Sequence, residues 1–205
     1  MTKVIAIEGM DGSGKTTLLD YLKENLDKEK FVFLKEPGST KPGVEIRKVI
    51  LENKLDSKTE LLLFYAARVE NIVQNIQKAK EENKNVILDR FELSSYAYQI
   101  YGNKKPELKE FIDMLSDKTG SCKVVDKYYF LNLTAEQSEE RKNQRTKEGG
   151  EENRFDKKEK EFFQNVQKGY LEEIKRFNHK IIDASKSIQG VREEFLEDFE
   201  KFIES

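Results

Sequence analysis

The residues best suited to chemistry stand near the start of the chain, in a run of glycines that ends with a lysine and a threonine. Glycine fills the first and sixth positions of residues 9–16, and Lys15 and Thr16 close the run. Glycines at this spacing let successive backbone N–H groups turn inward around a polyphosphate, which also meets the N-terminus of the next helix. Lys15 would reach the β- and γ-phosphates, and Thr16 would offer a hydroxyl to Mg²⁺. The run therefore predicts a phosphate-binding loop (P-loop) for a nucleoside triphosphate or a similar phosphate.

A second polar pair stands at the end of the expected strand 85–89, directly after its apolar residues 86–88. The pair is Asp89 and Arg90, so their side chains are expected at the carboxyl edge of a strand, where open α/β sheets bind ligands. Asp89 could organise Mg²⁺, and Arg90 could clamp a phosphate. A surface salt bridge at a strand end is the alternative interpretation.

Two expected helices carry side chains suited to reading a nucleobase. The spacing of Ser95, Tyr98 and Gln99 places a hydroxyl, a phenol and an amide on one helix face. Phe64 and Arg68 lie one helical turn apart and combine an aromatic plane with a guanidinium fork. A core aromatic with a snorkelling neighbour would give the same pair, so the interpretation depends on agreement among all the segments.

A hydrophilic stretch between residues 134 and 162 surrounds a glycine pair with basic side chains. Its basic residues include Arg141, Arg145, Lys147 and Arg154. Arginines delivered by a closing segment would neutralise charge on a migrating phosphoryl group and exclude water. The stretch predicts a lid at about 142–155, with a solvated charged loop as the alternative.

These groups can act together only if the fold brings them to one edge of a sheet. Five nearly continuous apolar runs of strand length occur at residues 4–8, 31–35, 85–89, 128–133 and 180–183. Segments of helical periodicity separate them, including stripes through Leu61 and Ile76, Phe163 and Phe177, and Val191 and Phe202. The alternation predicts an α/β fold in which helices cover both faces of a parallel sheet.

The composition fits one globular domain spanning residues 1–205. The chain carries 37 Lys+Arg against 39 Asp+Glu, a formal net charge of -2, so no strong field would attract a nucleic-acid polymer. No apolar run approaches the ~20 residues of a membrane span, so we expect a soluble cytoplasmic protein without a membrane partner. One cysteine and one histidine exclude an internal disulfide and the usual zinc cage.

The combined segments resemble the bacterial-type thymidylate kinases of the P-loop nucleoside monophosphate kinase family. The similarity runs through nearly the whole chain, in residues 8–17, 36–38, 63–68, 89–91, 95–99, 153–156 and 182–184. The resemblance implies a five-stranded parallel sheet flanked by helices, with a lid that closes over two nucleotides. It also implies that the γ-phosphoryl group of ATP passes to dTMP to form dTDP, with Mg²⁺, in dTTP synthesis, and that the protein is a homodimer.

The resemblance assigns the donor side of the site. The loop residues expected to bind ATP are Gly9, Met10, Asp11, Gly12, Ser13, Gly14, Lys15, Thr16 and Thr17. Thr16, Asp89 and Glu36 are the residues expected to order the metal and its waters. Residues 183–185 are expected to line the adenine, mostly through backbone groups.

The resemblance also assigns the acceptor side. Phe64 would stack on thymine and Arg68 would bond its O4, while Ser95 and Gln99 would read the remaining edge. Tyr98 would crowd out a ribose 2′-hydroxyl. Arg90 and Arg47 would hold the acceptor phosphate, and Asp11 would contact the acceptor sugar or phosphate region. Glu36 would also be one of the residues that bind the acceptor.

Gly12 stands where eukaryotic-type members of the family carry an arginine, so the resemblance implies that the missing charge comes from the lid. Arg145 and Arg154 are the lid candidates, and the choice between them stays open. The expected catalytic residues are Lys15, Arg90, Asp11, Arg145 and Arg154.

Two other functions stay open at this point. One is a kinase of another nucleoside or deoxynucleoside monophosphate on the same scaffold, which the base contacts would decide. The other is a catalytically idle nucleotide-binding switch. Lys15, Asp89 and Arg90 argue against the switch, because a pure binder has little use for transition-state charge.

Overall fold

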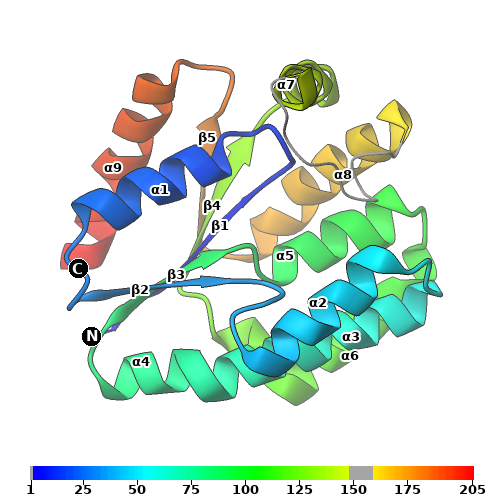
Figure 1. Cartoon of the computed structure of the whole chain (residues 1–205), viewed down its shortest axis with the longest axis horizontal. Helices are drawn as coiled ribbons and strands as arrows, with labels where there is room; N and C mark the ends of the chain where they lie inside the picture. Colours follow the sequence, from blue (N-terminus) through cyan, green and yellow to red (C-terminus); the bar gives the residue numbers. More distant parts are fainter. Residues whose placement is uncertain (1, 148–158) are drawn as a thin grey trace.

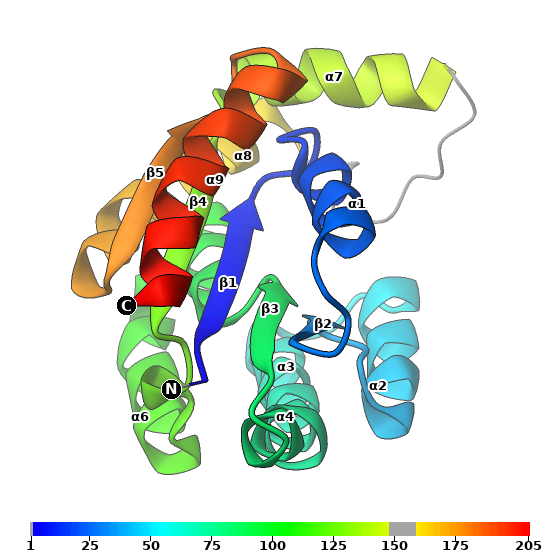
Figure 2. The same cartoon turned by 90° about the vertical axis from the view of Figure 1, so that its left-hand side faces the viewer.

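The structure, a computed structural model that describes residues 2–147 and 159–205, is built on a twisted parallel sheet (Figure 1 and Figure 2). The sheet has five strands in the order β2-β3-β1-β4-β5, and every neighbouring pair is parallel. The strands are β1 (Val4–Gly9), β2 (Phe31–Lys35), β3 (Asn85–Asp89), β4 (Lys127–Asn132) and β5 (His179–Asp183). The predicted five-stranded α/β architecture is confirmed, with each strand end within one residue of its expected position.

Helices make up most of the rest of the described chain. The α-helices are α1 (Lys15–Asn25), α2 (Lys41–Glu52), α3 (Ser57–Asn71), α4 (Gln77–Glu81), α5 (Glu92–Ser95), α6 (Lys109–Thr119), α7 (Ala135–Lys147), α8 (Lys160–Glu173) and α9 (Ile188–Glu204). Two segments with wider π-helical turns continue α3 and α5, namely η1 (Ile72–Ile76) and η2 (Tyr96–Gly102). Short 3₁₀ turns are η3 (Pro106–Leu108), η4 (Ser121–Lys123) and η5 (Ile174–Arg176). No helix in the part described has both the length and the apolar character that a bilayer crossing demands.

The two faces of the sheet pack against different helices, because successive side chains of a strand point to opposite sides. Val4 and Ala6 of β1 join a core with α4, α5 and α8. Ile5 and Ile7 of the same strand join a core with α1 and α9. Helices therefore cover both faces, as the alternating pattern predicts.

A third cluster fixes the elements that surround the expected acceptor pocket. Leu61 and Tyr65 of α3 pack with Tyr96 and Ile100 of η2 and with Ile112 of α6. The cluster holds α3 against η2, so the two helices expected to read a nucleobase lie side by side. Asp56 caps the N-terminus of α3, because its side chain accepts a hydrogen bond from a backbone N–H of the first turn.

The parallel register brings the chemical groups to one edge of the sheet. Ile7 of β1 pairs with Asp89 of β3, so the P-loop after β1 and the polar pair at the end of β3 are neighbours. Helix α7 follows β4 and lies across this same edge, above the end of β1 (Figure 2). The carboxyl edge of the sheet is therefore where the site must be sought.

Candidate active site

The P-loop links the end of β1 to the start of α1 and borders a cavity of about 740 Å³. Gly12 and Gly14 have left-handed backbone angles, with φ of 79° and 86°, which glycine adopts without strain. All loop residues from Met10 to Thr17 line the cavity, together with Arg141, Gln144, Ala184, Lys186, Ser187, Ile188, Val191 and Arg192. The expected donor residues are thus together in one cavity, apart from Gly9, which ends β1.

Lys15 and Asp89 form an ion pair beside this cavity. The Lys15 Nζ lies 3.3 Å from a carboxylate oxygen of Asp89, and Lys35 approaches the other oxygen at 3.7 Å. Burial lowers the pKa of the Lys15 ammonium and Arg90 adds repulsion, while Asp89 and Asp11 oppose both. Burial acts to raise the pKa of Asp89, but the cations of Lys15, Arg90 and Lys35 prevail and hold it below its usual value.

Arg90 is anchored by four side-chain hydrogen bonds at the start of the segment after β3. Its guanidinium donates to the Tyr170 hydroxyl at 2.9 Å, to Ser94 Oγ at 3.2 Å, to Asp11 Oδ1 at 3.2 Å and to the Tyr98 hydroxyl at 3.3 Å. The backbone of Arg90 is left-handed, with φ of 67°, which is uncommon for a residue with a side chain. The guanidinium therefore has a defined place between the P-loop and η2.

Glu8 stabilises the turn after Arg90 through hydrogen bonds. It is fully buried at the end of β1 and accepts hydrogen bonds from Phe91 N at 2.8 Å, Ser94 Oγ at 2.5 Å and the Tyr170 hydroxyl at 3.1 Å. Burial raises the pKa of the Glu8 carboxyl, and Arg90 and these donors oppose the shift. Glu8 thus fixes two of the groups to which Arg90 donates.

A second cavity lies next to the first and gathers the residues expected to hold the acceptor. Its lining comprises Asp11, Glu36, Pro37, Arg47, Ile50, Leu51, Phe64, Arg68, Arg90, Phe91, Ser94, Ser95, Tyr98 and Gln99. Every substrate-binding residue predicted from the sequence is among them. Arg47 is held to the wall by a 3.2 Å hydrogen bond from its Nη1 to the Pro37 carbonyl. Asp11 lines both cavities, so they meet at that residue.

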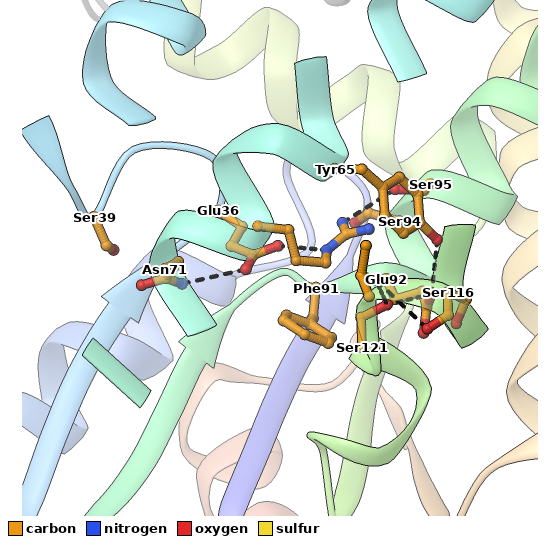
Figure 3. A network of polar contacts seen from close by, with 12 residues as sticks. Glu36, Ser39, Tyr65, Asn71, Phe91, Glu92, Ser94, Ser95, Ser116 and Ser121 are labelled. Carbon is orange, nitrogen blue, oxygen red and sulfur yellow. Dashed lines mark hydrogen bonds and ion pairs between the residues drawn. The ribbon is translucent and has the colours of Figure 1, made fainter. Parts of the chain in front are cut away.

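Arg68 is buried in the wall of the acceptor cavity and is oriented by two neighbours. Its Nε donates to Glu36 at 2.8 Å, and its Nη2 donates to Ser95 Oγ at 3.1 Å. Asn71 donates to the other oxygen of Glu36 at 3.2 Å (Figure 3). Within the residues that the structure describes, Nη1 of Arg68 is buried without a hydrogen-bond partner. A buried donor without a partner is costly, and Nη1 is a nitrogen of this guanidinium for which the described residues supply no acceptor.

The contacts of Glu36 lie on the acceptor side, and its expected role in ordering the metal and its waters stays a prediction. Both of its carboxylate oxygens are engaged by Arg68 and Asn71, and it lines the acceptor cavity but not the P-loop cavity. Burial raises the pKa of Glu36, and the adjacent Arg68 opposes that shift. In the structure, Glu36 orients Arg68.

The oxygen atoms of Thr16 and Asp89 suit a magnesium ion that is held mainly by substrate phosphates. Thr16 is exposed and lines the P-loop cavity, and the Asp89 carboxylate lies beside the neighbouring Lys15. Across residues 2–147 and 159–205, no group of three or more His, Cys, Asp or Glu side chains could form a metal cage. Mg²⁺ retains waters and takes one or two protein oxygens beside phosphates, which these two residues can supply.

Helix α7 packs directly on the P-loop at Gly12. A Cβ atom at Gly12 would lie 3.0 Å from the Ser138 carbonyl oxygen and 3.3 Å from Arg141 Cβ. Ser138 Oγ donates to the Asp11 carbonyl at 2.7 Å, and Arg141 Nη1 donates to the Gly12 carbonyl at 3.3 Å. A larger side chain at position 12 would collide with α7, and the guanidinium of Arg141 lies at this place instead.

Of the two lid arginines expected from the sequence, the structure describes only the backbone of one. Arg145 belongs to the last turns of α7, but its side chain is outside the described residues, as is the whole of Arg154. Residues 142–147 of the expected lid are helical, and the rest of it also lies outside the described part of the chain.

Comparison with known proteins gives one consistent result. The sequence profile of the family described as thymidylate kinase matches residues 7–195. A thymidylate kinase of Staphylococcus haemolyticus is 36% identical, over 99% of this chain and 100% of that protein, and one of a Marinomonas species is 35% identical, over 99% and 96%. The crystal structure of the thymidylate kinase of Ehrlichia chaffeensis superposes with a TM-score of 0.71 at 27% identity, covering 98% of each chain.

The chain belongs to the thymidylate kinase family. It is a nucleotide-binding phosphotransferase, and the resemblance read from its motifs is confirmed. ATP with Mg²⁺ is the donor of this family, which agrees with the P-loop cavity.

Several residues at the thymidylate kinase site were not predicted to act there. Tyr170 lies in the apolar stripe between Phe163 and Phe177, a pattern that indicates only core packing, yet its hydroxyl accepts a hydrogen bond from Arg90. Glu8 is the one charged residue of the otherwise apolar strand β1, a sequence signal that could have indicated a buried anchor. Arg141 was one of several basic residues in a polar stretch, and nothing in that stretch distinguished it.

Proposed function

We propose that this chain transfers the γ-phosphoryl group of ATP to dTMP, giving ADP and dTDP, in the synthesis of dTTP, and that the residues described above carry the reaction. Membership of the thymidylate kinase family supports the reaction. The observation that supports the residue assignment best is that a P-loop cavity and a cavity lined by Phe64 and Arg68 meet at Asp11. Two nucleotides can therefore lie head to tail with their phosphates adjoining.

The chemistry needs positioning and charge neutralisation more than proton transfer. The acceptor is a phosphate monoester with a second pKa near 6, so its oxygen is already largely ionised at neutral pH and attacks the γ-phosphorus in line. Lys15 and Arg90 face the developing charge from the donor and acceptor sides. Thr16 and Asp89 would help the donor phosphates to hold a Mg²⁺ ion, and that ion would supply charge neutralisation when bound.

The acceptor cavity explains how thymidylate would be held. Phe64 stacks on the thymine ring, and Arg68 donates its free Nη1 to O4. Ser95 and Gln99 complete the reading of the base edge. Tyr98 is buried beside Arg90, where its ring limits the room for a ribose 2′-hydroxyl.

The phosphate end of the acceptor is assigned to a separate group of residues. Arg90 and Arg47 bind the acceptor phosphate, and Asp11 contacts the acceptor where the two cavities meet. Arg145 and Arg154 remain the proposed lid arginines, and Arg141 joins them as a cation already beside the P-loop.

We also propose that the chain is one kinase domain that works as a homodimer in the cytoplasm. Exposed apolar side chains occur on neighbouring helices, at Val44 and Val49 of α2, Leu62 of α3 and Met114 of α6. Helix α3 contacts both α2 and α6, so these side chains lie on adjoining elements that a second subunit could cover. The proposed compartment follows from the substrates, because highly charged nucleotides do not enter a bilayer.

A phosphoryl-transfer assay with ATP and Mg²⁺ against all common nucleoside and deoxynucleoside monophosphates tests the proposal. We expect dTMP to give the highest kcat/KM, with dUMP next because it presents the same base edge. A preference for a purine or for cytidylate would reject the assigned acceptor, and the absence of transfer to any monophosphate would reject the enzyme.

A further inference from the structure

A buried carboxylate lies directly behind the residue expected to read the thymine edge. Gln99 lines the acceptor cavity and its side chain is only 2% exposed. Its Nε2 donates to Glu60 Oε1 at 3.0 Å. Glu60 is in the first turn of α3, is 3% exposed and does not line the cavity. The amide of Gln99 is therefore held from outside the cavity.

This contact determines which end of the amide remains for a ligand. A primary amide has two N–H donors on one end and a carbonyl acceptor on the other, whereas a carboxylate can only accept. Because Nε2 of Gln99 faces the Glu60 carboxylate, the carbonyl Oε1 is the end available to the cavity. Arg68, fixed by Glu36, lines the same cavity, and its Nη1 is a donor without a hydrogen-bond partner among the described residues. The cavity wall thus offers one acceptor and one donor to a base edge.

These two groups match one class of pyrimidine. Thymine and uracil carry an N3–H donor and an O4 acceptor, which complement a carbonyl and a guanidinium N–H respectively. Cytosine has the reverse pattern, with an unprotonated N3 and an amino group at C4. In this wall, the unprotonated N3 of cytosine would face the Gln99 carbonyl, so that two acceptors would meet. Its C4 amino group would face the guanidinium N–H of Arg68, so that two donors would meet. A site built on buried hydrogen bonds rejects such a mismatch strongly.

We propose that Glu60 is a positioning residue that makes the acceptor cavity selective for the thymine and uracil edge over the cytosine edge, by holding Gln99 with its carbonyl toward the base. The inference rests on the proposed function, since it assumes that a pyrimidine monophosphate occupies this cavity. Glu60 itself touches no substrate. It acts only through the orientation of Gln99.

The variant Glu60→Gln tests this role, because the replacement has nearly the same shape but can donate as well as accept. Gln99 would then be free to turn its amino group toward the cavity, where it suits cytosine. We expect the ratio of kcat/KM for dUMP to that for dCMP to fall roughly tenfold. The ratio for dTMP to dUMP should stay unchanged, because these substrates share one edge and differ only in the methyl group.

Glu92→Gln provides the matched control. Glu92 is also fully buried, and it accepts hydrogen bonds from the Tyr65 hydroxyl at 2.7 Å and Ser121 Oγ at 3.0 Å, outside the lining of the cavity (Figure 3). We expect this variant to lose stability while it keeps the wild-type ratio of dUMP to dCMP. An equal loss of selectivity in both variants would show a general effect of removing a buried charge and would overturn the proposal.

The outcomes separate this inference from the proposed function. A folded Glu60→Gln variant with the wild-type ratio would overturn the role of Glu60 alone. A wild-type enzyme that did not prefer dTMP and dUMP to dCMP would instead reject the proposed acceptor. If the variant does not fold, proton NMR of the wild-type protein with ¹⁵N-labelled dTMP decides: a slowly exchanging N3 imino proton supports the bond to Gln99, and a rapidly exchanging one overturns it.

Discussion

Lys15 shows how individual residues of the site depend on their surroundings. It is buried at the start of α1 and paired with Asp89, so its charge is fixed beside the place where donor phosphates would lie. We expect Lys15→Ala to lower kcat by about 10²- to 10³-fold, as the loss of a preorganised charge does elsewhere. A coupled ADP-release assay measures this. The control is Lys35→Ala, because Lys35 approaches the same carboxylate from an exposed position and should matter little.

Phe64 offers a residue-scale test of the acceptor side. It lines the acceptor cavity but not the P-loop cavity, so its removal should affect the two substrates differently. Stacking on a base is worth about 1–3 kcal/mol, so Phe64→Ala should raise the KM for dTMP roughly tenfold or more. The KM for ATP should change little. Equal changes in both constants, or none for dTMP, would contradict the stacking role.

Residues with strong local patterns could be predicted from the sequence, and residues whose role arises from packing could not. The glycine spacing before Lys15 and the pair Asp89 and Arg90 signal chemistry without any knowledge of the fold. The roles of Tyr170 and Glu60 depend on contacts across 80 and 39 positions of sequence, with Arg90 and Gln99 respectively. No local pattern encodes such contacts.

At the scale of elements, a buried acid of α8 links that helix to η2, η5 and α6. Glu173 of α8 accepts hydrogen bonds from the Tyr101 hydroxyl of η2 at 2.8 Å and from Arg176 at 2.9 Å, and Lys109 of α6 also binds it. Burial acts to raise the pKa of Glu173, but these cations and donors prevail and lower it.

The lowered pKa of Glu173 gives the sign of a pH effect. A carboxyl whose folded pKa lies below its unfolded value, near 4.3, contributes stability above that value and loses it as the pH falls through the folded pKa. We expect Glu173→Gln to reduce the free energy of unfolding by about 2 kcal/mol near pH 7, with the difference shrinking below about pH 4. Urea titrations at several pH values measure it. A difference that grew toward acid pH would contradict this account.

The contact between α7 and the P-loop gives a second element-scale test. Gly12 has a left-handed φ, and a Cβ there would press on the Ser138 carbonyl. We expect Gly12→Ala to weaken ATP binding and to cost roughly 1–2 kcal/mol of stability, because a substituted residue at this φ is strained. Calorimetric titration with ATP and thermal unfolding measure the two effects. Gly120→Ala is the control for the cost of a side chain at positive φ, since a Cβ at Gly120 would meet no atom within 4 Å from the other residues that the structure describes.

The positions of the strands could be predicted from the pattern of apolar residues, whereas the π-helical turns within the helices could not. The five strands are buried apolar runs, so their existence and nearly their ends could be predicted. The π-helical turns of η1 and η2 gave no such signal, because residues 72–76 and 96–102 still read as ordinary helix. Segment η2 contains Tyr98 and Gln99, so the exact direction of these side chains could not be derived from ideal helix spacing.

At the scale of the whole molecule, the exposed apolar side chains of α2, α3 and α6 bear on the proposed homodimer. Leu62 is 48% exposed and Val73, in η1, is 55% exposed. We expect the wild-type chain to sediment as a dimer at micromolar concentration and Leu62→Glu to sediment as a monomer, because a buried unpaired charge is strongly unfavourable in an interface. A monomeric wild-type protein, or an unaffected variant, would contradict the proposal.

The whole-molecule arrangement of two adjoining cavities is the central claim, and a crystal structure with dTMP and a non-hydrolysable ATP analogue tests it most directly. We predict the thymine ring against Phe64 with its O4 near Arg68, the monophosphate at Arg90, and the triphosphate of the analogue in the loop that ends at Lys15. Both phosphates should face each other at Asp11. Thymidylate bound away from Phe64 and Arg90 under saturating conditions, or a triphosphate outside the P-loop, would contradict the account.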